Sequence, residues 1–308
     1  MAMTINPTVA NSISLVTRYI PLLDEIYQNE SKTAFLDTEQ ERVRWDSDTH
    51  SFKLFETSMV GNADYSRNGG FVRGDVTATW REYTPQWDRG RQFVIDRVDN
   101  DETMGLAFGT LAAEYIRLHA IPEKDALRFA AYCDGAAAAN KKTESLSTAA
   151  QVVAAIDEAT VALDEAQVPY EGRILFVNHT IYGLFKAGIT RYTMNRENGI
   201  DYNIETYNNM RVISVPSVRF NTEITLGQPT AHDDDGGYTC TGSTINLMVL
   251  HPTAIMQAVG LAEPRIFSPG VWQQSQGWAW DYREYHGAWV KHQKANGIYV
   301  SAASFPST

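Results

Sequence analysis

The sequence predicts an α+β fold, because a hairpin pattern is followed by amphipathic helices and then by further strands. Between residues 52 and 83, Val76, Ala78 and Trp80 alternate with polar residues after a Gly-Gly turn, which is typical of a long β-hairpin. Beyond residue 99, apolar residues recur three or four positions apart, as they do in helices that bury one face.

The composition is that of a globular, acidic protein. The chain has 308 residues, of which 44% are hydrophobic and 20% charged, and this length corresponds to about two domains. The formal net charge of −11 disfavours a dedicated nucleic-acid binder, because the chain as a whole repels phosphate. Neither a signal peptide nor an apolar run of membrane-spanning length is present, which predicts synthesis and folding in a cytoplasm.

The first half of the chain contains an arm, the hairpin and three helices. Residues 1–40 show weak periodicity apart from a short helix near Leu15 to Tyr27, which indicates an arm. The hairpin buries too little by itself to be stable, so it must pack on this chain or on a neighbouring one. A long helix is expected from the D-x-x-E start at residues 99–102 to Leu118, and a second one from Pro122 to Gly135. The third helix spans about residues 147–167.

The second half alternates between strands and helices. The runs RILFV, MRVISVP and TINLMVLH predict buried strands, and Asn178 is expected to cap a short helix that ends near Gly188. Residues 227–243 are polar and rich in glycine, which predicts a loop. The Trp- and Tyr-rich C-terminal part is expected to pack the last strands, which end at residues 297–300.

The chain lacks the short motifs that mark common catalytic sites. His232 and Asp233 to Asp235 could hold a divalent cation, but consecutive residues rarely all face one ion, so a solvated loop is the favoured interpretation. His119 and Glu123 are expected to form a structural pair rather than an acid–base pair. Cys133 and Cys240 lie far apart in sequence, and both are expected to be reduced and buried.

The charged residues of the hairpin and first helix are unusual. No lysine occurs between Lys53 and Lys124, where the basic residues are Arg67, Arg73, Arg81, Arg89, Arg91, Arg97 and Arg117. The planar guanidinium group forms bidentate pairs and tolerates partial burial, which favours an ion-paired interface over chance composition on a solvated surface.

Two of these arginines are expected at a subunit boundary. Arg89 and Arg91 lie in a WDRGR sequence, where Gly90 would allow a bend that directs both side chains away from the strand. Carboxylates of a neighbouring subunit would then bind them. The alternative is that acids of the same chain, such as Asp96 and Glu102, satisfy both arginines.

Two blocks of the sequence resemble a known family. DYSRNGGFVRGDVTATWREYTPQWDRGRQFVIDRVDNDET with IPEKDALRFAAY, and the later DYREYHGAWVKHQKANGIYV, are similar to parts of tailed-phage major capsid proteins with the Hong Kong 97-like fold. The resemblance implies five segments: an N-terminal arm (1–50), an extended β-hairpin loop (51–98), a spine helix with peripheral domain (99–145), an axial domain (146–270) and a return to the peripheral domain (271–308).

The resemblance also implies a function. The chain would assemble as hexamers and pentamers into an icosahedral shell that encloses double-stranded DNA without reading its sequence, in a virion made in the bacterial cytoplasm. Neither enzymatic activity nor a cofactor or metal is expected. The implied interface residues are Arg67, Arg73, Arg81, Trp87, Arg89, Arg91, Asp233, Asp234 and Asp235, the last three as a ring near a five-fold or six-fold centre.

The implied partners are further copies of the chain and, in addition, a portal, a decoration protein and a separate scaffolding protein. A removable N-terminal scaffolding segment is not expected. Two other functions are compatible with the sequence: the shell of an encapsulin-like nanocompartment, and a metal-dependent hydrolase that uses the loop at His232 to Asp235.

Overall fold

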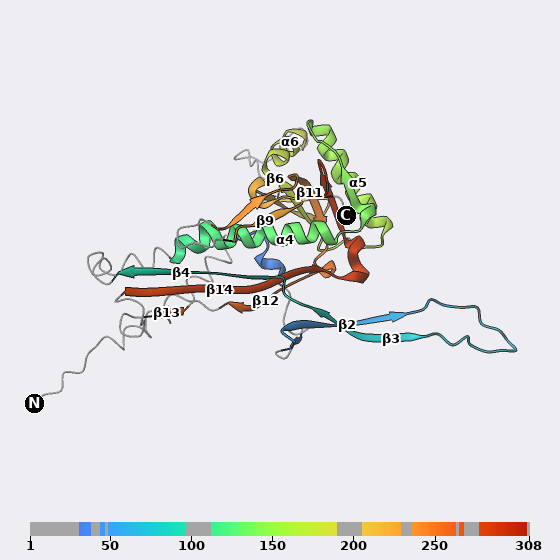
Figure 1. The fold of residues 1–308 in the computed structure, drawn as a ribbon. Coiled ribbons are helices and arrows are strands. Elements are labelled where there is room, and N and C mark those ends of the chain that lie inside the picture. The colour runs from blue at the N-terminus through green and yellow to red at the C-terminus, as the bar shows by residue number, and fades with distance from the viewer. Residues whose placement is uncertain are drawn as a thin grey trace, which may run out of the picture.

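The computed structural model describes residues 31–37, 44–46, 49–96, 112–189, 205–228, 236–262, 265–267 and 277–306. In Figure 1 one long hairpin, formed by residues 51–83, projects from a body of strands and helices. The predicted helix near residues 15–27 and the predicted helix start at residues 99–102 lie outside these ranges. Within them, no helix is long and apolar enough to cross a membrane.

The predicted hairpin is confirmed. Strand β2 (Ser51–Met59) pairs antiparallel with β3 (Val76–Tyr83), in continuous register from Phe52 opposite Tyr83 to Met59 opposite Val76. The short strand β1 (Arg44–Asp46) pairs with the first three residues of β2.

The strand that follows the hairpin belongs to the body. β4 (Trp87–Asp96) pairs over its whole length with β14 (Gly277–Val290), whose other edge pairs with β12 (Ile255–Ala262) and β13 (Arg265–Phe267). The bend predicted at WDRGR is therefore wrong. A Cβ atom on Gly90 would lie 2.7 Å from the carbonyl oxygen of Tyr282, so glycine here allows two strands to approach closely.

A helix lies along this four-stranded sheet. The chain is helical from residue 112, passes through a π-helical segment (Ile116–Ala120), and continues as α4 (Ile121–Gly135). The sequence predicts a second helix that starts at Pro122, whereas the structure has no break there. The wider π turn before Pro122 accommodates a residue that has no amide hydrogen to donate.

The second sheet has six strands, and the predicted strands and the cap at Asn178 are confirmed in it. Helices α5 (Ala149–Glu165) and α6 (His179–Ile189) cover one face, and Asn178 Oδ1 accepts a hydrogen bond of 2.9 Å from the amide of Thr180. The strand order is β5 (Lys141–Thr143), β15 (Ile298–Ala302), β11 (Ile245–Leu250), β6 (Ile174–Asn178), β8 (Met210–Val215) and β7 (Thr206–Tyr207).

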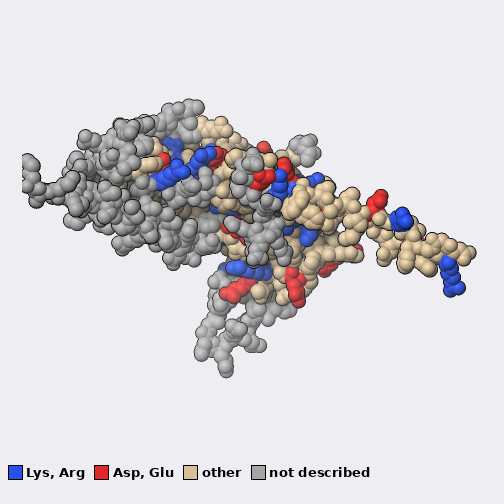
Figure 2. Space-filling view, turned by 90° about the horizontal axis from the view of Figure 1, so that it is seen from below, with Lys and Arg blue, Asp and Glu red and all other residues tan. Residues whose placement is uncertain are grey.

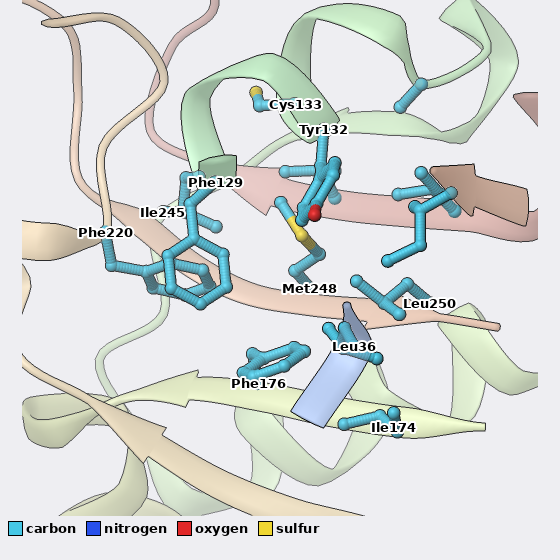
Figure 3. Close-up of a cluster of buried hydrophobic side chains, with 14 of the residues drawn as sticks. Leu36, Phe129, Tyr132, Cys133, Ile174, Phe176, Phe220, Ile245, Met248 and Leu250 are labelled. Carbon is cyan, nitrogen blue, oxygen red and sulfur yellow. The ribbon is translucent and has the colours of Figure 1, made fainter. Parts of the chain in front are cut away.

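The largest hydrophobic core lies between α4 and the six-stranded sheet (Figure 3). Phe129 and Tyr132 of α4 pack against Phe176 of β6 and Met248 of β11. Because β6 is buried on both faces, its residues contribute alternately to this core and to the one under α5 and α6. The core therefore joins the two sheets through α4.

Two expectations for the second half need correction. The loop predicted at residues 227–243 contains strand β10 (Tyr238–Cys240), which pairs with β9 (Ile224–Leu226). Cys133 is buried as expected, but Cys240 is exposed, because it lies on this small two-stranded sheet at the surface.

Candidate subunit interface

One face of the hairpin is apolar and exposed. Because successive side chains of a strand point to opposite faces, the opposed pairs Phe55–Trp80, Thr57–Ala78 and Met59–Val76 share a face. The rings of Phe55 and Trp80 lie 5.2 Å apart. The exposed fractions of Phe55, Met59, Val76 and Trp80 are 50%, 71%, 65% and 55%. We call these four residues with Ala78 the apolar face.

The opposite face of the hairpin is polar beyond its base, where Thr79 lies opposite Glu56 and Thr77 lies opposite Ser58. Glu56 accepts a hydrogen bond of 2.8 Å from the Tyr83 hydroxyl and lies 3.5 Å from Arg81 Nη1. Burial, followed by this hydrogen bond, raises the pKa of Tyr83 to about 12, so the phenol stays protonated. Arg81, one of the predicted interface residues, thus has a partner within its own chain.

The tip of the hairpin (residues 60–75) combines exposed rings with two of the predicted arginines. Phe71 is 87% exposed and lies 4.9 Å from the ring of Tyr65. Arg67 and Arg73 are exposed, and among the described residues neither forms an ion pair. Figure 2 shows the projection as a mostly uncharged surface with few charged side chains. Its exposed rings are typical of a surface that another protein covers.

The base of the hairpin is clamped to the four-stranded sheet. The ring of Trp289 on β14 lies 5.9 Å from the ring of Phe52 and 5.8 Å from that of Tyr83. A Cβ atom on Gly287 would lie 2.3 Å from the Trp289 ring, so glycine at this position provides the space for it. These contacts fix the direction in which the hairpin leaves the body.

Arg89 is satisfied within its own chain. Its Nε donates to Glu123 Oε1 at 2.5 Å, Nη1 donates to the carbonyl of Gly227 at 3.1 Å, and Nη2 donates to that of Gly237 at 3.2 Å. The structure thus supplies the intrachain alternative for Arg89, with Glu123 in place of Asp96 or Glu102. Arg89 joins β4, α4 and the two ends of the loop between β9 and β10.

Arg91 and its neighbours line a pocket of about 280 Å³ between α4 and the four-stranded sheet. His119, which the sequence pairs with Glu123, lines it too and stacks on Tyr115 at 5.6 Å. Trp87, another predicted interface residue, is the first residue of β4. Its ring lies 5.3 Å from that of His286 on β14. This position places Trp87 beside the core rather than on the projection.

The pocket contains a buried ion pair between Lys124 and Glu284. Burial favours the neutral carboxyl, but the Lys124 ammonium and hydrogen bonds from Lys124 and Tyr282 outweigh it and lower the pKa of Glu284 to about 2. Burial lowers the pKa of His286 to about 3, so this imidazole is neutral at physiological pH. Both groups hold a single protonation state near neutrality, which favours a structural role over acid–base catalysis.

Sequence reasoning missed a buried polar contact of residues 31–37. Asp125 of α4 accepts hydrogen bonds from Ser31 Oγ at 2.7 Å, the Lys32 amide at 2.9 Å and Thr33 Oγ1 at 2.6 Å. Arg128 donates to Thr33 and to Asp37. This segment is the described end of the predicted arm, and it is fixed on α4.

The acidic loop lies outside the described residues, which exclude His232 and Asp233 to Asp235. Its described flanks, Gly227 and Gly237, are bound by Arg89 beside α4. In the part of the chain that is described, no group of three or more His, Cys, Asp or Glu side chains could hold a metal ion.

Comparison with known proteins shows similarity at the level of structure only. Neither the protein-family models nor the curated proteins include a match. A chain of the mature capsid of bacteriophage PhiM1 is 12% identical, with a TM-score of 0.61 over 85% of each chain. A chain of the cyanophage P-SCSP1u capsid is 11% identical, with a TM-score of 0.58 over 88% of this chain and 87% of that one. A chain from Mycobacterium phage Che8 is 14% identical, with a TM-score of 0.58 over 90% and 92%. This protein therefore has the fold of phage capsid proteins, as its sequence resemblance implies.

Proposed function

We propose that this protein is a major capsid protein that assembles into the icosahedral shell around a phage double-stranded DNA genome. The apolar face of the hairpin is the observation that carries the proposal, on a fold shared with phage capsid structures. The role is structural rather than enzymatic, and its place is the virion capsid.

The area of the apolar face favours coverage by a second copy. Trp80 is 55% exposed, and burial of that remaining area would contribute about 3 kcal/mol. Because Trp289 fixes the base of the hairpin, the apolar face is already ordered in the free subunit. Binding of a neighbour to this face therefore avoids the loss of conformational entropy that the ordering of a flexible loop would cause.

The segments take the roles of the Hong Kong 97-like fold in this proposal. The hairpin within residues 51–98 is the extended loop, and the helix through α4 is the spine helix. The four-stranded sheet belongs to the peripheral domain, and the six-stranded sheet with α5 and α6 to the axial domain. Of the predicted interface arginines, Arg67, Arg73 and Arg81 lie on the hairpin itself, and in this proposal they lie at the subunit boundary.

A pair of neighbouring substitutions tests the proposal. Trp80→Glu introduces a charge on the apolar face, and Thr77→Glu introduces the same charge on the opposite face of β3, across from Ser58. The wild-type chain and Thr77→Glu should form closed shells at tens of micromolar by mass photometry and negative-stain microscopy, with a scaffolding partner if one is needed. Trp80→Glu should remain as free subunits with the wild-type unfolding midpoint.

Two results would contradict the proposal. The first is a wild-type chain that stays monomeric under all of these conditions. The second is equal shell formation by the two variants, because the apolar face would then not be an assembly contact. The contents of shells isolated from cells separate the viral function from the nanocompartment: nuclease-protected DNA supports the former, and a single protein cargo supports the latter.

A further inference from the structure

The pocket between α4 and the four-stranded sheet interrupts an otherwise apolar contact. At one end of β4, Trp87 packs against the large core, and towards the other end Phe93 packs with Trp280 in a smaller apolar cluster. Arg89 and Arg91 lie between Trp87 and Phe93 on the same face of the strand. Charged groups between a helix and a sheet are costly to desolvate, so this polar stretch calls for an explanation other than packing.

The charges that line the pocket are positive on balance. They comprise three basic side chains and two carboxylates: Arg89, Arg91, Lys124, Glu123 and Glu284. Glu123 accepts from Arg89, and Glu284 accepts from Lys124. Each carboxylate therefore already has a cation beside it, and Arg91 adds a further positive charge to the lining. A cavity whose lining charge has one sign attracts ions of the opposite sign, so this pocket favours an anion.

His286 contributes a buried polar atom to the same pocket. It is 2% exposed and lines the cavity, and in the described part of the chain its Nδ1 has no hydrogen-bond partner. Buried polar groups without a partner are rare because each one costs free energy. A neutral imidazole presents one ring nitrogen as a donor and the other as an acceptor, so a bound molecule can satisfy Nδ1 through either kind of group.

The wall of the pocket also carries aromatic rings. Tyr115 and His119 stack with their ring centroids 5.6 Å apart, and both line the cavity. The rings of Phe93 and Tyr282 meet Tyr115 edge-on at 4.8 and 5.7 Å. His119 belongs to the π-helical segment Ile116–Ala120, and single π turns within helices are frequent at functional sites. Rings in a pocket wall stack favourably on a planar ring of a ligand.

We propose that this pocket binds a small molecule that joins an anionic group to a planar ring, the chemistry of a mononucleotide or an aromatic carboxylate. The basic lining holds the anionic group, Tyr115 and His119 contact the ring, and His286 Nδ1 forms a hydrogen bond with the molecule. The volume of about 280 Å³ is near the lower end of the range for ligand pockets, which limits the ligand to about this size. The inference goes beyond the proposed function and does not depend on it, because a free subunit contains the whole pocket.

Isothermal titration calorimetry on the free, full-length subunit tests the inference. Adenosine monophosphate, uridine monophosphate and benzoate are the complete probes. Adenosine and benzamide lack the anionic group, and inorganic phosphate lacks the ring. At least one complete probe should bind about tenfold or more tightly than its incomplete counterparts, and the comparison of the nucleotides with benzoate identifies the source. The inference is overturned if no complete probe binds, or if phosphate or the neutral probes bind as tightly as the complete ones.

Three variants locate the binding in the pocket. Arg91→Met and His286→Phe keep the size of the side chain and remove its polar group, and each should weaken binding of the tightest probe about tenfold. Arg67→Met, at the exposed tip of the hairpin, is the matched control and should leave the affinity within about twofold of wild type. Equal affinities in Arg91→Met and the control would show that the probe binds elsewhere.

A measurement on the wild-type chain keeps the test independent of how the variants fold. The imidazole nitrogen resonances of a ¹⁵N-labelled subunit distinguish a protonated ring nitrogen from one with a free lone pair. Saturation with the tightest probe should shift the Nδ1 resonance of His286 and leave that of the exposed His292 in place. A bound probe that leaves the His286 resonances unchanged would overturn the assignment of the pocket.

Discussion

Substitution of Arg89 by alanine should destabilise the free subunit. The side chain of Arg89 is 24% exposed and that of Glu123 is 13% exposed, so the substitution leaves a carboxylate mostly buried and unpaired. Removal of one partner from a fully buried ion pair costs about 3 to 5 kcal/mol. Partial exposure of this pair reduces the expected loss in the free energy of unfolding to about 2 to 3 kcal/mol.

A double-mutant cycle in urea isolates the contribution of the pair. Arg89→Ala, Glu123→Ala and the double variant should show a coupling energy above about 1 kcal/mol, because the second substitution removes a group that the first has already left unpaired. Arg67→Ala, at the exposed tip, is the matched control and should stay within about 0.5 kcal/mol of wild type. Additive effects, or an Arg89→Ala variant as stable as the control, would refute the reasoning.

Three further outcomes are expected. Gly287→Ala should lower the free energy of unfolding by about 1 to 3 kcal/mol, because the new methyl group would overlap the Trp289 ring. An unchanged thermal midpoint would show that the Trp289 contact at the base of the hairpin does not require glycine at this position. Asp125→Asn should speed proteolysis within residues 31–37, because an uncharged acceptor binds Ser31, the Lys32 amide and Thr33 less strongly; equal cleavage rates would argue against the anchor. His286 has a folded-state pKa of about 3, below its unfolded value of about 6.5, so stability is constant above pH 6.5 and falls by about 1 kcal/mol per pH unit as the pH decreases from there towards 3. His286→Phe should lose this slope between pH 6.5 and 5, and an identical slope in the variant would show that other groups cause it.

The hairpin could be predicted from the sequence because its signal is local. Alternation with period two places Val76, Ala78 and Trp80 on one face whatever the rest of the chain does. The strands RILFV, MRVISVP and TINLMVLH were predictable for the same reason, since continuous apolar runs between turn residues mark buried strands. The order of these strands in the six-stranded sheet depends on long-range contacts and did not follow from such patterns.

β4 could not be predicted because charged side chains lie on both of its faces, and each face contacts a different part of the chain. Asp88 points to the outer face, where both carboxylate oxygens accept hydrogen bonds from Arg283, while Arg89 points towards α4 and Glu123. In the sequence these charges resemble a polar turn around Gly90. Only the pairing with β14, far along the chain, shows that Asp88 has a partner on the adjacent strand and Arg89 a partner on α4.

The anchor at residues 31–37 was missed for a related reason. Thr33 and Asp125 are 92 positions apart, and serine, threonine and aspartate in a polar segment normally indicate a turn. Among the predicted interface residues, the arginines on the projection keep their role in the proposal, whereas Arg89 is used inside the subunit. Residue type indicated partial burial correctly for Arg89 but not for Arg67 and Arg73, which are exposed, and it did not distinguish a partner in the same chain from one in another.

The distribution of interactions suggests how stability and assembly are separated. The ion pairs of Arg89, Lys124 and Arg128 join elements of the body, whereas the hairpin exposes the apolar face. Complete burial of that face would contribute on the order of 10 kcal/mol, which is comparable to the roughly 4 to 15 kcal/mol that association costs. One hairpin contact therefore leaves association marginal, so subunits should remain soluble until several contacts form together, as they do when a shell closes.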